Sequence, residues 1–435
     1  MDNRDVIQSS IDYIEENIKT EITAEELAAK SGFSLFHYYH IFQSMTGMPV
    51  MQYVLRRRLA HAIYEIGCGG KMIEVALEYG FDTHAGFYKA FRREYDYAPS
   101  QYFKNRIIKK PYKINLKQGE LLMITRKKLS EMLVHWDAEN EKITDIYYNG
   151  TSNRNENAWY VGSDFVMKAT TNLSALKSHI EISNALEKSG LIAATPIATK
   201  EGKNYILDDD VSFSLTKRLH GDCIKSGEMY DGDYTSKSRY LGEIIGQLHL
   251  ILEKYDKDII CNNSNLLETV SSWALPKTKE AMALPEAFYS DYLDTFGTLF
   301  VKLPKQIIHR DPNPGNIILE DGKLSGFIDF DLTERNVRLF DPCYASTGIL
   351  SEGFAQGDAE KLDKWIEIYK NIIFGYDSVC KLSKEEKRAL PYVIFSIQMI
   401  CVAYFNETDK YSELAQTNKK MLVWLYENRG KLIIH

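Results

Sequence analysis

The sequence predicts a multidomain protein in which an all-α domain precedes a larger α+β domain. The chain has 435 residues, which is long for a single domain. A helix–turn–helix pattern occurs twice within residues 1–103. Residues 307–331 predict a β-hairpin whose ends carry acidic and amide side chains. We expect boundaries at 1–106 for the helical domain, 107–130 for a basic linker and 131–435 for the α+β domain.

The composition is that of a globular protein with substantial cores, because 44% of the residues are hydrophobic and 26% are charged. No run of about 18 apolar residues is evident, so the sequence predicts no transmembrane helix. The polar N-terminus has no signal-peptide pattern. The six cysteines are scattered without a Cys-x-x-Cys pair, which favours free thiols in the cytoplasm over disulfides or a zinc site.

The charge is distributed unevenly along the chain. The net charge is −7, yet residues 1–110 hold 14 basic and 14 acidic side chains. Residues 131–435 hold 34 basic and 45 acidic side chains. This asymmetry indicates two parts with different partners.

The helical part contains two copies of one pattern. Residues 26–34 match residues 74–82 at an offset of 48, and Phe42 and Phe91 then align at an offset of 49. Residues 23–26 predict a capping box at the start of one helix. A repeat of this length, with Gly-Phe at each turn, predicts two helix–turn–helix units.

These two units and the Ala-Pro-Ser-Gln-Tyr segment at 98–102 resemble the AraC-type DNA-binding domain. The resemblance implies recognition helices at 34–45 and 83–95 that enter the major groove. A domain retained for protein contacts is the alternative, and the linker could be a DNA-tracking arm or a solvated connector. The residues implied for base or backbone contact are Phe36, His37, His40, Thr83, His84, Gly86 and Lys89, with Arg56, Arg57, Arg58, Arg92 and Arg93 toward phosphates.

Oxygen-bearing side chains cluster around the predicted hairpin. Asp311 and Asn316 precede its first strand, and Asp329 and Asp331 follow its second strand. Oxygen ligands gathered at one edge suit Mg²⁺ beside phosphates, and a separate aspartate in the preceding loop suits a base for a hydroxyl proton. A plain hairpin with acidic turns would not explain this placement.

His309-Arg310-Asp311, Asn316 and Ile328-Asp329 resemble the catalytic loop and metal-binding segment of protein-kinase-like enzymes. The form of the motif is closest to the aminoglycoside phosphotransferase and choline/homoserine kinase group. The resemblance implies a bilobal kinase-like fold, with a small lobe at 131–220 and a large lobe at 221–435. It also implies catalytic roles for Asp311 and His309, ATP as cofactor, and Mg²⁺ on Asn316, Asp329 and Asp331.

The small lobe is expected to hold the nucleotide. Strands are expected at 143–148, 158–161 and 165–168, and strand segments at 191–196 and 204–207 are expected to continue the sheet. By resemblance, Lys168 contacts the α- and β-phosphates and pairs with a glutamate of the helix at 176–189, Glu181 or else Glu187. The loop implied to cover the phosphates contains Gly150, Thr151, Ser152 and Asn153.

Two functions follow from these resemblances. The first is a DNA-binding regulator whose second domain transfers the ATP γ-phosphate to a hydroxyl of a small molecule. The second is a regulator whose kinase-like domain only senses a nucleotide or metabolite. The expected partners are DNA and a small hydroxyl-bearing acceptor or effector, without a membrane, and a homodimer is one open state of assembly.

Overall fold

The structure is a computed structural model that describes residues 3–95, 97–111, 114, 116, 124–147, 154–209, 211–407 and 412–434. Its contacts divide the chain into two compact units. Unit 1 contains Met1–Thr171 and Pro196–Arg218, and unit 2 contains Asn172–Thr195 and Leu219–His435. The helical domain and the first β-sheet therefore belong to the same unit, although the sequence placed them in different domains.

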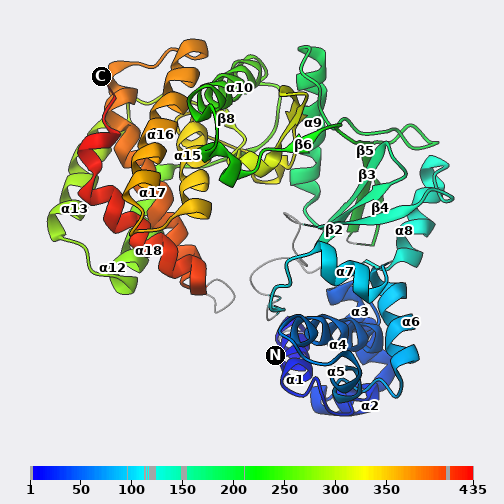
Figure 1. The fold of residues 1–435 in the computed structure, drawn as a ribbon. Helices are drawn as coiled ribbons and strands as arrows, with labels where there is room; N and C mark the ends of the chain where they lie inside the picture. The colour runs from blue at the N-terminus through cyan, green and yellow to red at the C-terminus, as the bar shows by residue number, and fades with distance from the viewer. Residues whose placement is uncertain are drawn as a thin grey trace. The chain divides into compact units, whose positions relative to one another are not determined.

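The helical part of unit 1 is the predicted pair of helix–turn–helix units. Helices α2 and α3 form the first unit, α5 and α6 form the second, and the long helix α4 connects them (Figure 1). Large apolar side chains, among them Ile11, Phe42, Tyr53 and Phe91, fill a common core. The bounds are α1 Asn3–Glu16, α2 Ala24–Ser31, α3 Leu35–Thr46, α4 Val50–Gly67, α5 Met72–Glu78, α6 His84–Tyr95 and α7 Pro99–Asn105.

The two turns have the same backbone structure. Gly32 and Gly80 are left-handed, with φ of 71° and 76°, and the next N–H, of Phe33 or Phe81, donates to the carbonyl of Ala28 or Ala76. Such helix ends favour glycine because a side chain is strained at positive φ.

The helix that follows each turn is capped by a hydroxyl. Ser34 accepts from the N–H of His37, whereas in the second copy Thr83 accepts from the N–H of Gly86. Both cap residues and both donors are 49 positions apart, so the extra residue of the second copy lies between Gly80 and Thr83. The expected capping box at 23–26 forms only in part: Thr23 caps the N–H of Glu26, while the Glu26 carboxylate accepts from the hydroxyl of Tyr13.

Two described residues of the expected linker pack into the helical core. Ile114 and Leu116 belong to the helical core, and Gln8 exchanges hydrogen bonds with the backbone of both. Helix α8 (Arg126–Leu133) begins inside the segment expected to be linker. The segment is therefore part of the core at Ile114 and Leu116, whereas Lys109 and Lys110 are exposed.

The sheet of unit 1 is antiparallel, with strand order β1-β2-β3-β5-β4. Its apolar face packs on α8 through side chains such as Trp159, Met167 and Phe213. The expected strand at 191–196 is wrong, because only Pro196 forms a bridge, to Thr216. The bounds are β1 Ile143–Tyr147, β2 Arg154–Val161, β3 Phe165–Thr170, β4 Ile206–Asp208 and β5 Val211–Lys217.

Unit 2 contains two small sheets and a bundle of long helices (Figure 1). One sheet has the order β10-β9-β6 and the other β7-β11-β8. The strands are β6 Asp222–Cys223, β7 Asn262–Asn263, β8 Lys305–Ile308, β9 Ile317–Glu320, β10 Lys323–Phe327 and β11 Glu334–Val337. The longest helices are α9 Leu173–Lys188, α10 Tyr234–Lys254, α15 Phe340–Gly353, α16 Ala359–Val379, α17 Lys384–Phe405 and α18 Ser412–Glu427, and the shorter ones are α11 Leu266–Thr269, α12 Leu275–Ala281, α13 Glu286–Asp291 and α14 Gly297–Phe300.

Helices α10 and α16 approach each other closely through glycine. A Cβ atom on Gly242 would lie 1.9 Å from the carbonyl oxygen of Ile372, and one on Gly375 would lie 1.9 Å from that of Arg239. Both glycines are therefore required by the packing of the two backbones.

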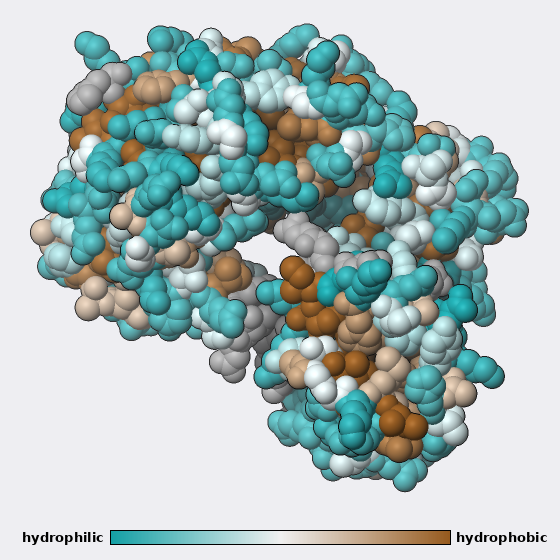
Figure 2. Space-filling view, viewed as in Figure 1, coloured by the Kyte–Doolittle hydropathy of each residue, from teal (hydrophilic) through white to brown (hydrophobic). Residues whose placement is uncertain are grey.

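Helix α17 (Lys384–Phe405) is a long apolar helix. Among the described residues it is the one helix long and apolar enough to cross a membrane by length and composition, and 67% of its apolar window is buried inside the protein. A core helix of a globular protein has the same properties. The visible face of the molecule is mostly hydrophilic, with apolar residues in small groups (Figure 2).

Candidate functional site

The catalytic loop and the predicted metal-binding segment meet at the hairpin of unit 2. Strands β9 and β10 form the predicted hairpin, in an antiparallel register that places Ile317 opposite Phe327. The N–H of Ile328 then donates to the carbonyl of Asn316 at 3.0 Å. This bond fixes Asp329 next to Asn316, which precedes the hairpin.

Asp311 is held by two amide side chains. The Nδ2 of Asn313 donates to Asp311 Oδ1 at 2.9 Å, and the Nδ2 of Asn316 donates to Asp311 Oδ2 at 3.0 Å. Burial raises the pKa of Asp311, the bond from Asn313 opposes this, and the charge of Asp329 raises it further. The carboxylate is thus oriented as a general base requires. The role of Asn313 was missed, although Asp-Pro-Asn places an amide two residues after the aspartate.

A buried aspartate holds the backbone of this loop. Asp341, at the start of α15, is fully buried and accepts from the N–H of His309 at 2.8 Å and of Arg310 at 3.0 Å. Its Oδ2 also lies 2.9 Å from Nε2 of His249, whose Nδ1 lies 2.8 Å from the hydroxyl of Tyr376. Asp341, His249 and Tyr376 therefore form a hydrogen-bonded support beneath the loop.

His309 acts on the loop rather than on a reacting atom. Its ring is fully buried, and Nε2 lies 3.0 Å from the carbonyl oxygen of Ile328. This contact joins the catalytic loop to the segment that carries Asp329. We therefore correct the expected catalytic role of His309 to a positioning role.

Arg310 has a strained backbone that its side chain helps to hold. Its φ is 75°, a left-handed conformation that an arginine adopts at a cost of about 1–3 kcal/mol. Its Nε donates to Glu334 at 2.9 Å, and its guanidinium lies 3.9 Å from the centre of the Phe340 ring. Strands β8 and β11 place Glu334 opposite Ile308, directly before the loop.

The chemistry of these side chains suits a divalent cation. Asp329 also has a left-handed backbone, with φ of 66°, and its charge disfavours the ionised form of Asp311. Because Nδ2 of Asn316 is bonded to Asp311, the amide oxygen of Asn316 is its remaining donor to a cation. Asp331 lies half-buried in the following 3₁₀ turn, Phe330–Leu332. The described residues contain no group of three or more His, Cys, Asp or Glu side chains suited to a metal, so phosphate or water oxygens would have to complete the shell.

Lys168 lies in the middle of the sheet of unit 1. In β3 it is the register partner of Ala158 in β2 and of Ser214 in β5, and it is half-buried. The predicted phosphate loop, Gly150, Thr151, Ser152 and Asn153, lies outside the described residues. Within unit 2, the exposed Glu181 of α9 accepts from the N–H of Ile260 at 3.2 Å.

The predicted recognition helices expose their expected DNA contacts. On α3, Phe36 is 85% exposed and Tyr38 is fully buried. Residues 36–40 all carry ring side chains, and of these only the ring of Tyr38 is in the core while the others are exposed. The exposed predicted residues are Phe36, His37 and His40 on α3, Thr83 just before α6, and His84, Gly86, Lys89 and Arg92 on α6.

Arg57 is a structural residue, which corrects its expected contact with DNA. Its side chain is 7% exposed and forms an ion pair with Glu15, and His61 lies 2.9 Å from the same carboxylate. Arg56 is also buried in ion pairs, and Arg58 donates to the carbonyls of Ile18 and Thr20. Sequence reasoning could not separate these arginines from surface cations, because their partners are distant in the chain.

The fold and site define a helix–turn–helix regulator joined to a kinase-like phosphotransferase domain. The model of the phosphotransferase enzyme family matches residues 152–380, which is more than half of the chain. The chain belongs to the phosphotransferase enzyme family. A helix-turn-helix domain model matches residues 27–105, which identifies the N-terminal part as an AraC-type DNA-binding domain.

Curated relatives match the N-terminal domain. The regulatory protein SoxS of Salmonella typhimurium is 31% identical over 103 residues, which are 23% of this chain and 96% of that protein. The uncharacterized transcriptional regulator YbfP of Bacillus subtilis is 34% identical over 97 residues, which are 22% of this chain but only 33% of that protein. The chain thus spans a third of the length of YbfP.

Solved structures match the kinase-like part. The match to a microcompartment-associated aminopropanol kinase covers 71% of this chain and 99% of the chain of that kinase, with 14% identity and a TM-score of 0.54. A GDP complex of aminoglycoside 2′-phosphotransferase-IIIa covers 70% and 99%, with 13% identity and a TM-score of 0.52. Amicoumacin kinase hAmiN, solved with AMP-PNP and Ca²⁺, covers 71% and 94%, with 14% identity and a TM-score of 0.50. At this identity the likeness establishes the fold.

Proposed function

We propose that the protein is a transcriptional regulator whose second domain transfers the γ-phosphoryl group of ATP to a hydroxyl of a small molecule. One observation carries this proposal. Asp311 accepts hydrogen bonds from the amide side chains of Asn313 and Asn316, and Asn316 is held next to Asp329 by the hydrogen bond from the N–H of Ile328. This arrangement supports a base for a hydroxyl proton and oxygen donors for a phosphate-bound cation within one loop and hairpin.

The roles follow from this arrangement. The acceptor hydroxyl donates its proton to the carboxylate of Asp311 as its oxygen bonds to the γ-phosphorus and ADP leaves. Asn316 and Asp329, with support from Asp331, would hold Mg²⁺, which neutralises charge on the phosphates when bound. Lys168 would contact the phosphates of ATP.

The loop supports this function because hydrogen bonds within unit 2 hold its backbone. The hydrogen bonds that the N–H groups of His309 and Arg310 donate to Asp341 hold the strained backbone at Arg310. The contact of His309 with Ile328 joins the loop to the segment of Asp329. Phosphoryl transfer depends mainly on positioning and electrostatic stabilisation, so a preformed loop is the feature that such an enzyme requires.

The test is ATP consumption by the full chain with Mg²⁺ over a panel of aminoglycosides, amino alcohols and sugars. We expect turnover with at least one acceptor, and Asp311→Asn should lower it at least about 100-fold. Asp363→Asn is the matched control, because Asp363 forms an exposed ion pair with Lys431. Nucleotide binding without Asp311-dependent turnover would overturn the proposed transfer and favour a sensor of nucleotide or metabolite.

DNA binding is tested separately, with a duplex that the full chain selects from a random pool. Because phosphate neutralisation dominates non-specific affinity, binding should weaken as salt rises. Equal affinity for selected and scrambled duplexes at every salt concentration would contradict sequence-specific regulation.

A further inference from the structure

A buried network of charged side chains joins the DNA-binding helices to the sheet of unit 1. Arg56 of α4 contacts Glu94 of α6 at 2.9 Å and Glu156 of β2 at 2.8 Å. Arg154, the first residue of β2, contacts Glu94 at 2.8 Å and Asp145 of β1 at 3.4 Å. We call Arg56, Glu94, Asp145, Arg154 and Glu156 the junction network. Their side chains are 5–27% exposed, so solvent screens these contacts weakly.

A second contact holds the other strand at the same end of the sheet. The guanidinium carbon of Arg106, directly after α7, lies 3.4 Å from the centre of the Tyr147 ring at the end of β1. The Tyr147 ring also lies 6.1 Å, centre to centre, from Tyr102 of α7 in an edge-to-face arrangement. Side chains of the DNA-binding domain therefore contact the end of β1, at Tyr147, and the start of β2, at Arg154.

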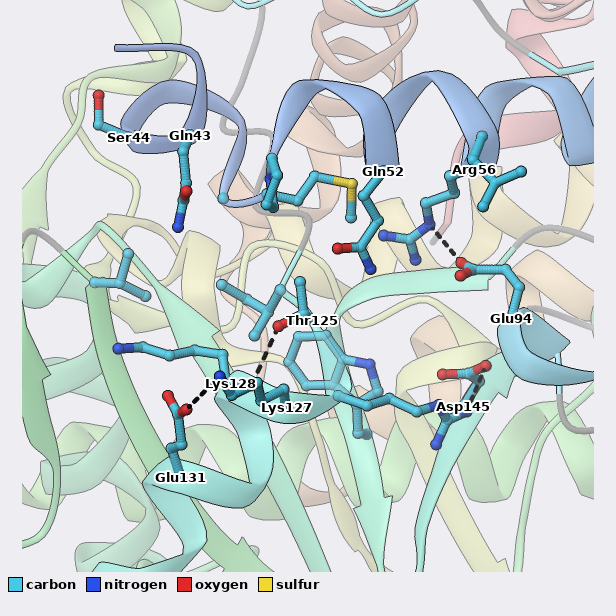
Figure 3. Close-up of a pocket in the computed structure, with 18 of the residues that line it drawn as sticks. Gln43, Ser44, Gln52, Arg56, Glu94, Thr125, Lys127, Lys128, Glu131 and Asp145 are labelled. Carbon is cyan, nitrogen blue, oxygen red and sulfur yellow. Dashed lines mark hydrogen bonds and ion pairs between the residues drawn. The ribbon is translucent and has the colours of Figure 1, made fainter. Parts of the chain in front are cut away.

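The junction is not solidly packed. A cavity of about 760 Å³ borders the network, and Figure 3 shows Arg56 of α4 facing Glu94 of α6 above Asp145 of β1. Its walls come from α3, α4 and α6 on one side and from α8 and the sheet on the other. His40 of the first recognition helix and Trp159 of β2 both line it. Since packed cores resist small shifts, open space beside the network allows the two parts to move relative to each other.

The sheet links this junction to the proposed phosphate contact. Arg154 and Ala158 are both in β2, and Ala158 is the register partner of Lys168 in β3. A displacement of β2 at Arg154 therefore moves Ala158 in the same strand, and Ala158 is paired with Lys168 in β3. Each step of this route lies inside unit 1.

We propose that DNA binding and nucleotide binding are coupled through the junction network. The proposal rests on the proposed function, because it requires that Lys168 contacts a nucleotide. DNA bound to α3 and α6 biases the position of Arg56 and Glu94, and the network passes this bias to β2 and Lys168. By thermodynamic linkage, a nucleotide must change DNA affinity by the same factor as DNA changes nucleotide affinity.

Buried ion pairs suit this purpose. Separating a buried carboxylate from its arginine leaves an uncompensated charge in a region of low dielectric, so intermediate positions are disfavoured. In the network Glu94 contacts both arginines, and each arginine also contacts a second carboxylate. Loss of Glu94 therefore weakens the link but leaves each arginine with a partner.

The experiment measures both affinities on the full chain. The nucleotide probe is AMP-PNP with Mg²⁺, and the DNA probe is a duplex selected by the full chain from a random pool. We expect saturating DNA to change the Kd of AMP-PNP about five-fold or more, and AMP-PNP to change the Kd of DNA by the same factor. In Glu94→Gln both factors should fall toward one, while each ligand alone binds within about two-fold of wild type.

Two further variants keep the result interpretable. Among the described residues Arg106 forms no ion pair, so Arg106→Gln removes the cation over Tyr147 without separating it from a carboxylate there. It should also reduce the coupling, which keeps the proposal testable if Glu94→Gln does not fold. Asp208→Asn is the matched control, because its ion pair with Lys128 joins β4 to α8 and not to the DNA-binding helices. This control should keep the wild-type coupling.

The outcomes separate this proposal from the proposed function. If AMP-PNP does not bind the wild-type chain, both are overturned. If both ligands bind but neither changes the affinity of the other, only the coupling is overturned. Coupling that survives unchanged in both Glu94→Gln and Arg106→Gln would overturn the route through the network.

Discussion

Replacement of Asp341 by asparagine should destabilise unit 2 and disable the catalytic loop. The buried carboxylate accepts from two consecutive backbone N–H groups, of His309 and Arg310, and contacts His249. An asparagine has one acceptor oxygen, and its NH₂ group would face a donor. At least one of the two N–H groups would therefore lose its partner inside the protein.

The magnitude follows from these contacts. A hydrogen bond to a charged acceptor contributes about 1.5–3 kcal/mol, and a buried donor left without a partner costs about 1–3 kcal/mol. The expected loss is therefore about 3–5 kcal/mol, a large share of the roughly 5–15 kcal/mol that stabilises a typical domain. Release of the left-handed backbone at Arg310 should also misplace Asp311, and a displacement of 1 Å can lower turnover about 100-fold.

The assay is urea unfolding of the full chain followed by tryptophan fluorescence. Trp365 donates to the carbonyl of Ser346 on α15, the helix that carries Asp341, so its emission reports on this region. Asp363→Asn is the control for the same chemical change at an exposed ion pair, where about 0.5 kcal/mol or less is expected. DNA affinity should stay unchanged in Asp341→Asn when AMP-PNP is absent.

The reasoning would be refuted if Asp341→Asn and Asp363→Asn shifted the urea midpoint equally. Equal turnover of Asp341→Asn and wild type would refute the claim that the hydrogen bonds to Asp341 hold the catalytic loop in its active shape. A lower midpoint with unchanged turnover would confine Asp341 to a stabilising role.

Three further predictions concern other parts of the chain. Phe36→Ala should lower DNA affinity about 5- to 150-fold in a gel-shift assay without affecting folding, because the ring is 85% exposed on α3. Glu15→Gln should destabilise the DNA-binding domain by about 3 kcal/mol at pH 7, followed by far-ultraviolet circular dichroism, because it strands the buried Arg57. Burial raises the pKa of Glu15, but hydrogen bonds from His61 and Arg57 outweigh burial and leave the pKa below 4.5. The ion pair therefore stabilises the fold fully above the unfolded-state pKa of Glu15, and this stabilisation is lost as pH falls through the folded-state pKa. Gly242→Ala should destabilise unit 2 by about 3 kcal/mol or more, because the new Cβ would lie 1.9 Å from a backbone oxygen of α16, and thermal unfolding measures this.

Each of these predictions has a matched control. Ile73→Ala removes another exposed apolar side chain, on α5, and should leave DNA affinity within about two-fold; an equal loss would contradict a specific role for Phe36. Glu16→Gln changes the exposed neighbour of Glu15, and equal shifts at both positions would argue against the buried ion pair. Gly297→Ala in α14 meets no atom within 4 Å and should be neutral or stabilising by about 0.5–1 kcal/mol. A similar loss at Gly242 and Gly297 would contradict a specific effect of the contact between Gly242 and α16.

Local sequence patterns were sufficient to predict the helix–turn–helix pair and the hairpin at 317–327. Both depend on interactions between residues close in the chain: a left-handed glycine after a helix, a hydroxyl that caps the next helix, and a turn between two apolar runs. The prediction of a strand at 191–196 was wrong because it used local patterns alone, whereas strand pairing depends on distant residues. Its apolar residues favoured a strand, but nothing in the local pattern showed that only Pro196 pairs with a neighbour.

The sequence by itself determined which chemical groups the protein carries and their order: two recognition helices, a lysine on a strand, and aspartates and an asparagine around a hairpin. Only the tertiary structure decided the surroundings of each group. It placed Arg57 against Glu15, more than 40 positions away, and Asp341 beneath the backbone of His309. It also joined the first sheet to the DNA-binding helices through Glu94 and Arg154. The physical reason is that burial and charge pairing depend on residues distant in the chain, whereas helices, turns and caps depend on near neighbours.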